Sequence, residues 1–460
     1  MNDHHPGTKL LGGLVRILFI EVDTAREWAC ASIGPAFIAA YLRAKGHEVS
    51  LYRASVDKTP EEIVSDIRAT SPELLGISLT TRQWLRAREL VKAIRAEIDV
   101  PVVAGGLHPT FSPTPVLESP GFDYVCLGEG EEPMLDLVTA LENGGPTSGI
   151  DNIWSVGGTQ PALRPPFQPL DDMPFMARDM LDEYAGCVHM TTQRGCPFPC
   201  TYCAARMYNE LYEETANYGR RRSHNSVVEE LLEIQSNGTL AYVIFLDDTF
   251  TIYRRWVREF CRIYGERLAI PFSLHARVET VTEQLIGELA AAGCKHITYG
   301  VESGSLRVRR DIMQRAATND RIKEVFRWTQ EAGIMVTANY MLGIPGETRE
   351  DLQQTFDLAV ELQEYALDFG YFVFYPYPGT ALFRLCLEQG YLPGDYLERE
   401  ANHRESILSL PDLTRDDIAE YYDRFTVLRE RQSLERAGAS LSDEAQATIR
   451  ESVQHNASTG

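Results

Sequence analysis

The sequence lacks any uninterrupted apolar stretch close to the roughly 18 to 20 residues that a helix needs to cross a bilayer. Its apolar N-terminal segment, residues 10–20, is broken by Gly12, Gly13 and Arg16. We therefore interpret that segment as a strand and not as a signal peptide. Together these absences predict a cytoplasmic protein with no membrane span.

Positive charge is also scarce. Lysine and arginine number 44 against 66 aspartate and glutamate residues, which gives a formal net charge of -22. Because a strongly negative surface repels phosphate backbones, we expect no nucleic acid partner. One run, Arg220–Arg222, opposes this trend, and for it we favour a solvated face over a contact to an anion.

Cysteine is limited to nine residues in a chain of 460. In a cytoplasmic protein such cysteines are more often metal ligands or small buried residues than disulfides. The length exceeds the roughly 100 to 200 residues of one ordinary domain, so two or three compact units are expected.

The first unit is predicted over residues 1–143. Short apolar runs alternate there with amphipathic stretches, which is typical of βαβ units and a parallel sheet. We expect a doubly wound, flavodoxin-like α/β fold of the Rossmann type, whose ligands lie beyond the carboxyl ends of the strands. The predicted strands are 15–20, 48–52, 74–78, 102–104 and 124–127, and the predicted helices are 35–45, 60–69, 83–97 and 132–141.

Residues 144–184 are rich in proline and have little helical periodicity, so they are predicted to connect two domains. A second alternating series predicts a partial (β/α)6 barrel over residues 185–390, with functional groups at the carboxyl ends of its strands. Residues 391–460 are predicted to form a small helical region with a frayed tail. The barrel strands are expected at 188–193, 242–247, 272–275, 297–301, 336–341 and 371–374.

Three cysteines, Cys196, Cys200 and Cys203, follow the first barrel strand on a proline-stiffened loop. Thiols this close together can hold one metal centre. A [4Fe-4S] cube is normally held by four thiolates, so a three-cysteine loop leaves one iron open, and an open position is what a catalytic metal site needs. The alternative is a zinc site, which needs a fourth ligand; Cys187 and His189 lie upstream, on or before the strand.

The C-x3-C-x2-C spacing, with Tyr202 before the last cysteine, closely resembles the radical S-adenosylmethionine superfamily. The resemblance implies a [4Fe-4S] cluster on the three cysteines, whose open iron chelates S-adenosylmethionine. Tyr202 matches the residue that lies against the adenine. Reductive cleavage of the cofactor would yield a 5'-deoxyadenosyl radical, with the electron supplied by an external donor such as flavodoxin or ferredoxin.

Other predicted strand ends match the same superfamily. The resemblance implies that Asp247 and Asp248 meet the ammonium group of S-adenosylmethionine, although paired carboxylates at a strand end could equally cap a helix. Arg277 is expected to meet the cofactor carboxylate by a charge-assisted fork. Glu302 and Ser303 match the segment that contacts the ribose.

Glycine-rich loops follow the fourth and fifth predicted strands of the first domain, and paired glycines let a backbone approach a bulky ligand closely. Because a radical barrel follows them, these loops resemble the cobalamin (B12)-binding domain of the B12-dependent subgroup, a resemblance that covers residues 15–390. The loop at residues 21–24 lacks the Asp-x-His-x-x-Gly motif of the methionine-synthase type, so a cobalt-bound histidine is not expected. The implied cobalamin contacts are Thr80, Thr81, Gly105, Gly106, His108, Thr110, Gly128, Glu129 and Gly130.

The resemblance implies a methyltransferase that methylates an unactivated carbon of a small natural-product or lipid intermediate. The alternative has the same fold and cofactors but performs non-methylating radical chemistry, such as oxidative cyclisation, ring contraction or rearrangement. A tRNA methylthiotransferase would carry a second cluster on three N-terminal cysteines, whereas only Cys30 and Cys126 precede the connector. A cobalamin sensor or carrier would have no use for the three-cysteine loop.

Overall fold

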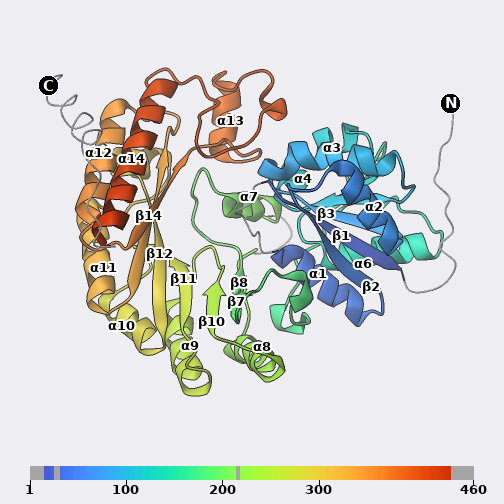
Figure 1. The fold of residues 1–460 in the computed structure, drawn as a ribbon, viewed down its shortest axis with the longest axis horizontal. Helices are drawn as coiled ribbons and strands as arrows, with labels where there is room; N and C mark the ends of the chain where they lie inside the picture. Colours follow the sequence, from blue (N-terminus) through green and yellow to red (C-terminus); the bar gives the residue numbers. More distant parts are fainter. Residues whose placement is uncertain (1–14, 25–31, 214–217, 437–460) are drawn as a thin grey trace.

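Two α/β units stand side by side in the computed structural model, which describes residues 15–24, 32–213 and 218–436 (Figure 1). The first unit contains a six-stranded sheet in the order β2-β1-β3-β4-β5-β6. Its first five strands are parallel, and the last pairs antiparallel with its neighbour. The strands are β1 (Arg16–Val22), β2 (Glu48–Ala54), β3 (Leu74–Ser78), β4 (Val102–Gly105), β5 (Tyr124–Cys126) and β6 (Ile153–Ser155).

This sheet is buried on both faces, as is usual for parallel strands. Successive side chains of a strand point to opposite faces, so Ile17 and Phe19 of β1 enter one hydrophobic core while Leu18 and Ile20 enter another. The predicted doubly wound α/β fold is thereby confirmed. The helices that cover the sheet are α1 (Ile33–Ala44) and α6 (Glu131–Glu142) on the first core and α2 (Pro60–Thr70) and α3 (Trp84–Arg95) on the second.

The second unit is built on a wholly parallel sheet of six strands in the order β14-β13-β12-β11-β10-β7, as the predicted partial barrel requires. Buried residues alternate along β13 with the partly exposed Thr337, Asn339 and Met341, which gives this sheet a polar inner face. The strands are β7 (Cys187–Met190), β10 (Tyr242–Phe245), β11 (Phe272–Ala276), β12 (Cys294–Glu302), β13 (Met335–Leu342) and β14 (Asp368–Val373).

Helices cover the side of the barrel sheet that is turned away from the first unit (Figure 1). Each follows one strand in sequence and buries an apolar stripe, which is the arrangement of βα repeats. They are α8 (His224–Asn237), α9 (Arg254–Arg267), α10 (Glu283–Ala291), α11 (Asn319–Glu331) and α12 (Arg349–Leu362).

The C-terminal part contacts both the barrel sheet and the first unit. Helix α14 (Arg415–Arg436) packs on β14 through Phe425, which stacks on Tyr371 at 5.6 Å. Arg88 of α3 reaches across to Glu398 with two hydrogen bonds of 2.8 Å, so this part also contacts the first unit. The predicted frayed tail falls outside the described residues, and the domain limits at 143, 184 and 390 stay predictions. Among the helices described, none is long and apolar enough to span a membrane.

Candidate active site

The three-cysteine loop leaves the short strand β8 (Gln193–Arg194) and leads into α7 (Ala204–Leu211), which lies between the two units (Figure 1). Cys196 and Cys200 are buried and Cys203 is half-buried, and all three are free thiols. The Cys200 sulfur accepts a hydrogen bond from Arg277 at 2.9 Å. Burial raises the pKa of Cys196, and it raises the pKa of Cys203 to about 12.

An iron–sulfur cluster suits this donor set, because thiolates are its ligands and three free thiols share one loop beside a guanidinium group. Metal ligands must lose their protons, which a bound cation makes favourable even for buried thiols. Across the described ranges no three His, Cys, Asp or Glu side chains already converge on one point. The three thiols are nevertheless neighbours, since the charges of Cys200 and Cys196 both contribute to the raised pKa of Cys203.

Arg277, the residue that follows β11, packs its side chain against the cysteine loop. Its guanidinium group lies 3.9 Å from the ring centre of Phe198 and donates to Glu279 at 2.9 Å, in addition to its contact with Cys200. The residue is only 6% exposed. The structure thus brings Arg277 to the predicted cluster loop, and its predicted contact to the cofactor carboxylate stays a prediction.

Arg315 contacts two of the residues that are predicted to bind S-adenosylmethionine, Tyr202 and Glu302. Its guanidinium group donates to the Tyr202 hydroxyl at 3.1 Å and lies 3.7 Å from the Glu302 carboxylate. Burial raises the pKa of Glu302, and burial also holds the pKa of Tyr202 well above its usual value. Ser303 is not part of this group, since it is fully buried and its hydroxyl lies 3.0 Å from Thr355.

The two aspartates after β10 have different surroundings. Asp247 is buried and accepts hydrogen bonds from the backbone of Thr192 at 2.8 Å and of Gln193 at 2.9 Å. Burial raises its pKa to about 6. Asp248 remains accessible, and its negative charge contributes to the raised pKa of Cys196. Asp248 is therefore the carboxylate that lies on the open side, beside the cysteine loop.

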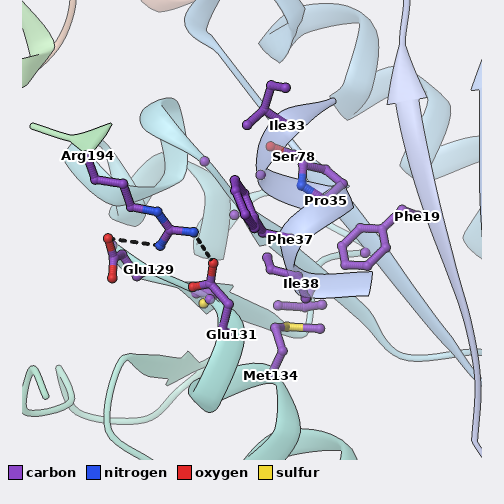
Figure 2. A pocket seen from close by; sticks show the side chains of 18 of the residues that line it. Phe19, Ile33, Pro35, Phe37, Ile38, Ser78, Glu129, Glu131, Met134 and Arg194 are labelled. Carbon is purple, nitrogen blue, oxygen red and sulfur yellow. Dashed lines mark hydrogen bonds and ion pairs between the residues drawn. The ribbon is translucent and has the colours of Figure 1, made fainter. Parts of the chain in front are cut away.

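A cavity of about 270 Å³, here called the sheet cavity, opens at the carboxyl ends of β3, β4 and β5, with Phe19 of β1 in its lining. Figure 2 shows its apolar side chains, among them Phe19, Ile38 and Met134, and the guanidinium group of Arg194 reaching in from the barrel unit. Ligands of doubly wound sheets bind at this edge. Of the predicted cobalamin contacts, the structure brings Gly105, Gly106, Gly128, Glu129 and Gly130 to the sheet cavity.

Glycine is required at several points of that wall. Gly106 has a φ of +93°, and an added Cβ would lie 2.9 Å from the backbone of Leu79. At Gly130 a Cβ would lie 2.7 Å from Ile38, a lining residue. The glycines therefore keep the cavity wall thin, which fits the close approach of a bulky cofactor.

His108 and Thr110 do not line the sheet cavity. The His108 ring is buried, stacks on Trp84 at 5.1 Å and lies 3.2 Å from the Thr81 hydroxyl through Nδ1. Burial lowers its pKa to about 4. Thr110 accepts a hydrogen bond from the backbone of Gly128 at 3.0 Å. Both side chains connect the predicted cobalamin loops to one another.

A second cavity, of about 410 Å³, lies where the two units meet and is here called the shared cavity. One wall is formed by Thr80 and Thr81, the predicted cobalamin contacts that follow β3. Tyr202 and Cys203 of the cysteine loop also line this cavity. Both predicted cofactor sites therefore open onto one space.

The prediction that Arg220–Arg222 form a solvated face is wrong. Arg220 donates to Glu129 at 3.0 Å, and Arg222 lies 2.7 Å from Glu230. The side chains of Arg220 and Arg222 are only 6% and 5% exposed. Glu129 comes from the loop after β5 in the first unit, whereas Glu230 lies on α8, the helix that follows the arginine run.

A network of buried charges joins the two units at the sheet cavity. Arg194, two residues before Cys196, lies 3.0 Å from Glu129 and 2.5 Å from Glu131 (Figure 2). Only Glu129 of these was expected at a site. The acidic pair in the Gly-Glu-Gly-Glu run is the single sequence signal that could have pointed to the others.

Comparisons with known proteins agree with this geometry. The Radical SAM superfamily matches residues 190–359, and the B12 binding domain matches residues 26–138. An uncharacterized methyltransferase of Pyrococcus horikoshii is 30% identical over 78% of this chain and 79% of its own length. The anaerobic magnesium-protoporphyrin IX monomethyl ester cyclase of Rubrivivax gelatinosus is 26% identical over 80% of this chain and 70% of its own.

A solved structure has a similar fold. It is the radical S-adenosylmethionine methyltransferase TsrM from Kitasatospora setae with cobalamin and a [4Fe-4S] cluster bound. Its TM-score is 0.67 at 19% identity, over 82% of this chain and 75% of that chain. At that identity the likeness concerns the fold.

Proposed function

The chain belongs to the cobalamin-dependent radical S-adenosylmethionine enzymes, and on that premise we propose that it methylates an unactivated carbon of a small molecule. Its cofactors are a [4Fe-4S] cluster, S-adenosylmethionine and cobalamin. An external electron donor such as flavodoxin or ferredoxin is part of the proposal.

The shared cavity carries this proposal. Thr81 and Cys203 line the same space of about 410 Å³, so a substrate held there lies beside both predicted cofactor sites. When bound, the cofactors supply a hydrogen-abstracting radical and a transferable methyl group, while the protein supplies orientation and exclusion of water. The name of the Pyrococcus relative, a methyltransferase, supports the same reading.

The chain's own residues have three tasks in this proposal. Cys196, Cys200 and Cys203 would hold the cluster, with Arg277 beside Cys200 at 2.9 Å. The loops after β3, β4 and β5 would hold cobalamin in the sheet cavity and against the shared cavity. The apolar lining of the shared cavity, which includes Val22, Leu107 and Met207, would exclude water from the reacting carbon.

A second candidate function is non-methylating radical chemistry on the same cofactors, such as oxidative cyclisation. The observation in its favour is the likeness to the magnesium-protoporphyrin IX monomethyl ester cyclase. Both candidates put the substrate in the shared cavity, so the reaction products have to separate them.

The test is anaerobic reconstitution with iron, sulfide and cobalamin, followed by reductant, methyl-deuterated S-adenosylmethionine and a small-molecule extract of the source organism. Methyl transfer predicts near-equal amounts of S-adenosylhomocysteine and 5'-deoxyadenosine, with deuterium in a new metabolite found by mass spectrometry. 5'-Deoxyadenosine with an unlabelled product would contradict methyl transfer and favour the second candidate.

A further inference from the structure

A third cavity, of about 740 Å³, adjoins the shared cavity and is here called the polar cavity. The two have Thr24, Arg82 and His403 in common. Its walls come from the inner face of β13 and β14, from the loop at residues 400–404 and from α14. Its volume is within the roughly 300 to 1,000 Å³ of small-molecule sites.

Resting on the proposed function, we infer that the polar cavity binds the substrate, and that the substrate is a hydrophilic molecule with a carboxylate or phosphoryl group. The charges and hydrogen-bonding groups of the cavity walls support this inference. Three arginines, Arg82, Arg404 and Arg429, line the cavity of a protein whose formal net charge is -22.

The carboxylates of the cavity leave the charge of Arg404 unneutralised. Asp368 is bound by Arg429 through two hydrogen bonds of 2.8 Å, so this pair is already satisfied. Glu400 is exposed. Arg404 has an exposed side chain beside the Tyr422 hydroxyl, and within the described ranges no carboxylate forms an ion pair with it. Arg404 is thus positioned to bind an incoming anion.

Positive potential also reaches the passage between the two cavities. The charge of Arg82 helps to lower the pKa of His403, second to the effect of burial. His403 Nε2 lies 3.0 Å from the Tyr377 hydroxyl, and both side chains line the shared cavity. A substrate group that reaches His403 would therefore lie beside the space that the cofactor sites share.

Hydrogen-bonding groups form the floor of the polar cavity. Thr337 and Asn339 project from β13, and Thr337 also meets His296 at 2.8 Å. Thr337 keeps His296 as a partner, but an apolar chain that covered Asn339 would leave its side-chain amide without one, which is costly. A hydroxyl group of a polar substrate would satisfy that amide instead. This lining disfavours a lipid and favours a substrate whose charged end lies here while its reacting carbon enters the apolar shared cavity.

The test divides the extract of the source organism into anionic, neutral hydrophilic and lipid fractions before the reconstituted enzyme is assayed on each. The inference predicts that the substrate is consumed from the anionic fraction. Arg404→Gln should then raise its KM roughly 10- to 100-fold with little change in kcat, since one charge-assisted hydrogen bond is lost. Arg399→Gln is the matched control, because Arg399 pairs with Asp395 outside the cavity and should leave both constants unchanged.

The outcomes separate this inference from the proposed function. Deuterium found in a product made from the lipid or neutral fraction would support methyl transfer but overturn the inference that the substrate is anionic. Consumption of an anionic compound without deuterium would keep the substrate class and overturn methyl transfer. An anionic fraction that contains no substrate, or a KM that Arg404→Gln leaves unchanged, would overturn the inference. Cobalamin binding, measured by absorbance titration, should be equal in the wild type and both variants.

Discussion

Arg194 holds the two units together by charge, and its replacement by Met removes that charge while keeping most of the side-chain length. From β8 it reaches Glu129 at 3.0 Å and Glu131 at 2.5 Å. Glu129 keeps a second partner in Arg220. Glu131 is different, since its side chain is 4% exposed and, in the described part of the chain, its only ion pair is the one with Arg194.

The size of the effect follows from the carboxylate left behind. Removing one partner of a buried ion pair costs about 3 to 5 kcal/mol. Protonation limits that cost, because neutralising a carboxyl group of ordinary glutamate pKa at pH 7 takes about 3.7 kcal/mol. We expect Arg194→Met to lower the free energy of unfolding by about 3 to 4 kcal/mol. For a cooperative unit of roughly 150 to 250 residues this corresponds to a decrease of about 6 to 16 °C in Tm.

The assay is thermal unfolding at pH 7 followed by circular dichroism. The matched control is the double variant Arg194→Met with Glu131→Gln, which leaves no unpaired charge and should recover most of the lost stability. A single variant as stable as the wild type, or a double variant no more stable than the single one, would refute the reasoning.

Three further predictions concern single positions. Cys200→Ala should abolish the absorbance of the reconstituted cluster and 5'-deoxyadenosine formation, whereas Cys187→Ala, a half-buried cysteine outside the loop, should retain both. Asp247 has its pKa raised from 3.8 to about 6 by burial, so its contribution to stability is complete below pH 4 and is lost as the pH rises through 6. Asp247→Asn should therefore remove about 3 kcal/mol of pH dependence from urea unfolding between pH 4 and 7. Gly128→Ala should weaken cobalamin binding in an absorbance titration by roughly tenfold or more, because its φ is +72° and a Cβ would collide with the Tyr212 hydroxyl.

Each of these predictions can fail separately. A cluster that forms in Cys200→Ala would remove that thiol from the ligand set. A cluster lost in Cys187→Ala would add a fourth thiolate to that set and leave no open iron. An unchanged pH dependence in Asp247→Asn would mean that Asp247 ionises normally in the folded protein. Unaltered cobalamin affinity in Gly128→Ala would show that the loop after β5 can move without consequence.

Strand positions could be predicted because a buried parallel strand appears in the sequence as a short apolar run. Strand β3 spans Leu74–Ser78, the predicted residues. Strand β14 begins three residues earlier than predicted, since its first residue, Asp368, is polar and is held by Arg429 from a helix far along the chain. Strand β6 lies in the stretch predicted to connect the two domains, and the structure instead pairs it antiparallel with β5 at the edge of the first sheet.

Local motifs located the predicted cluster loop, but distant partners could not be predicted from the chain. Arg315 reaches Tyr202 across 113 positions, and no periodicity marks such a contact. Neighbouring aspartates presented a different difficulty, because Asp247 and Asp248 occupy opposite surroundings at one strand end. Which of the two faces the open side depends on the tertiary structure around β10.

The two predicted cofactor sites open onto one cavity, which both Thr81 and Cys203 line. Electron paramagnetic resonance of protein that holds both a reduced cluster and cob(II)alamin tests this claim most directly. The account predicts spin–spin interaction, so the spectrum of the doubly loaded protein should differ from the sum of the two singly loaded spectra. A spectrum equal to that sum would contradict the shared cavity.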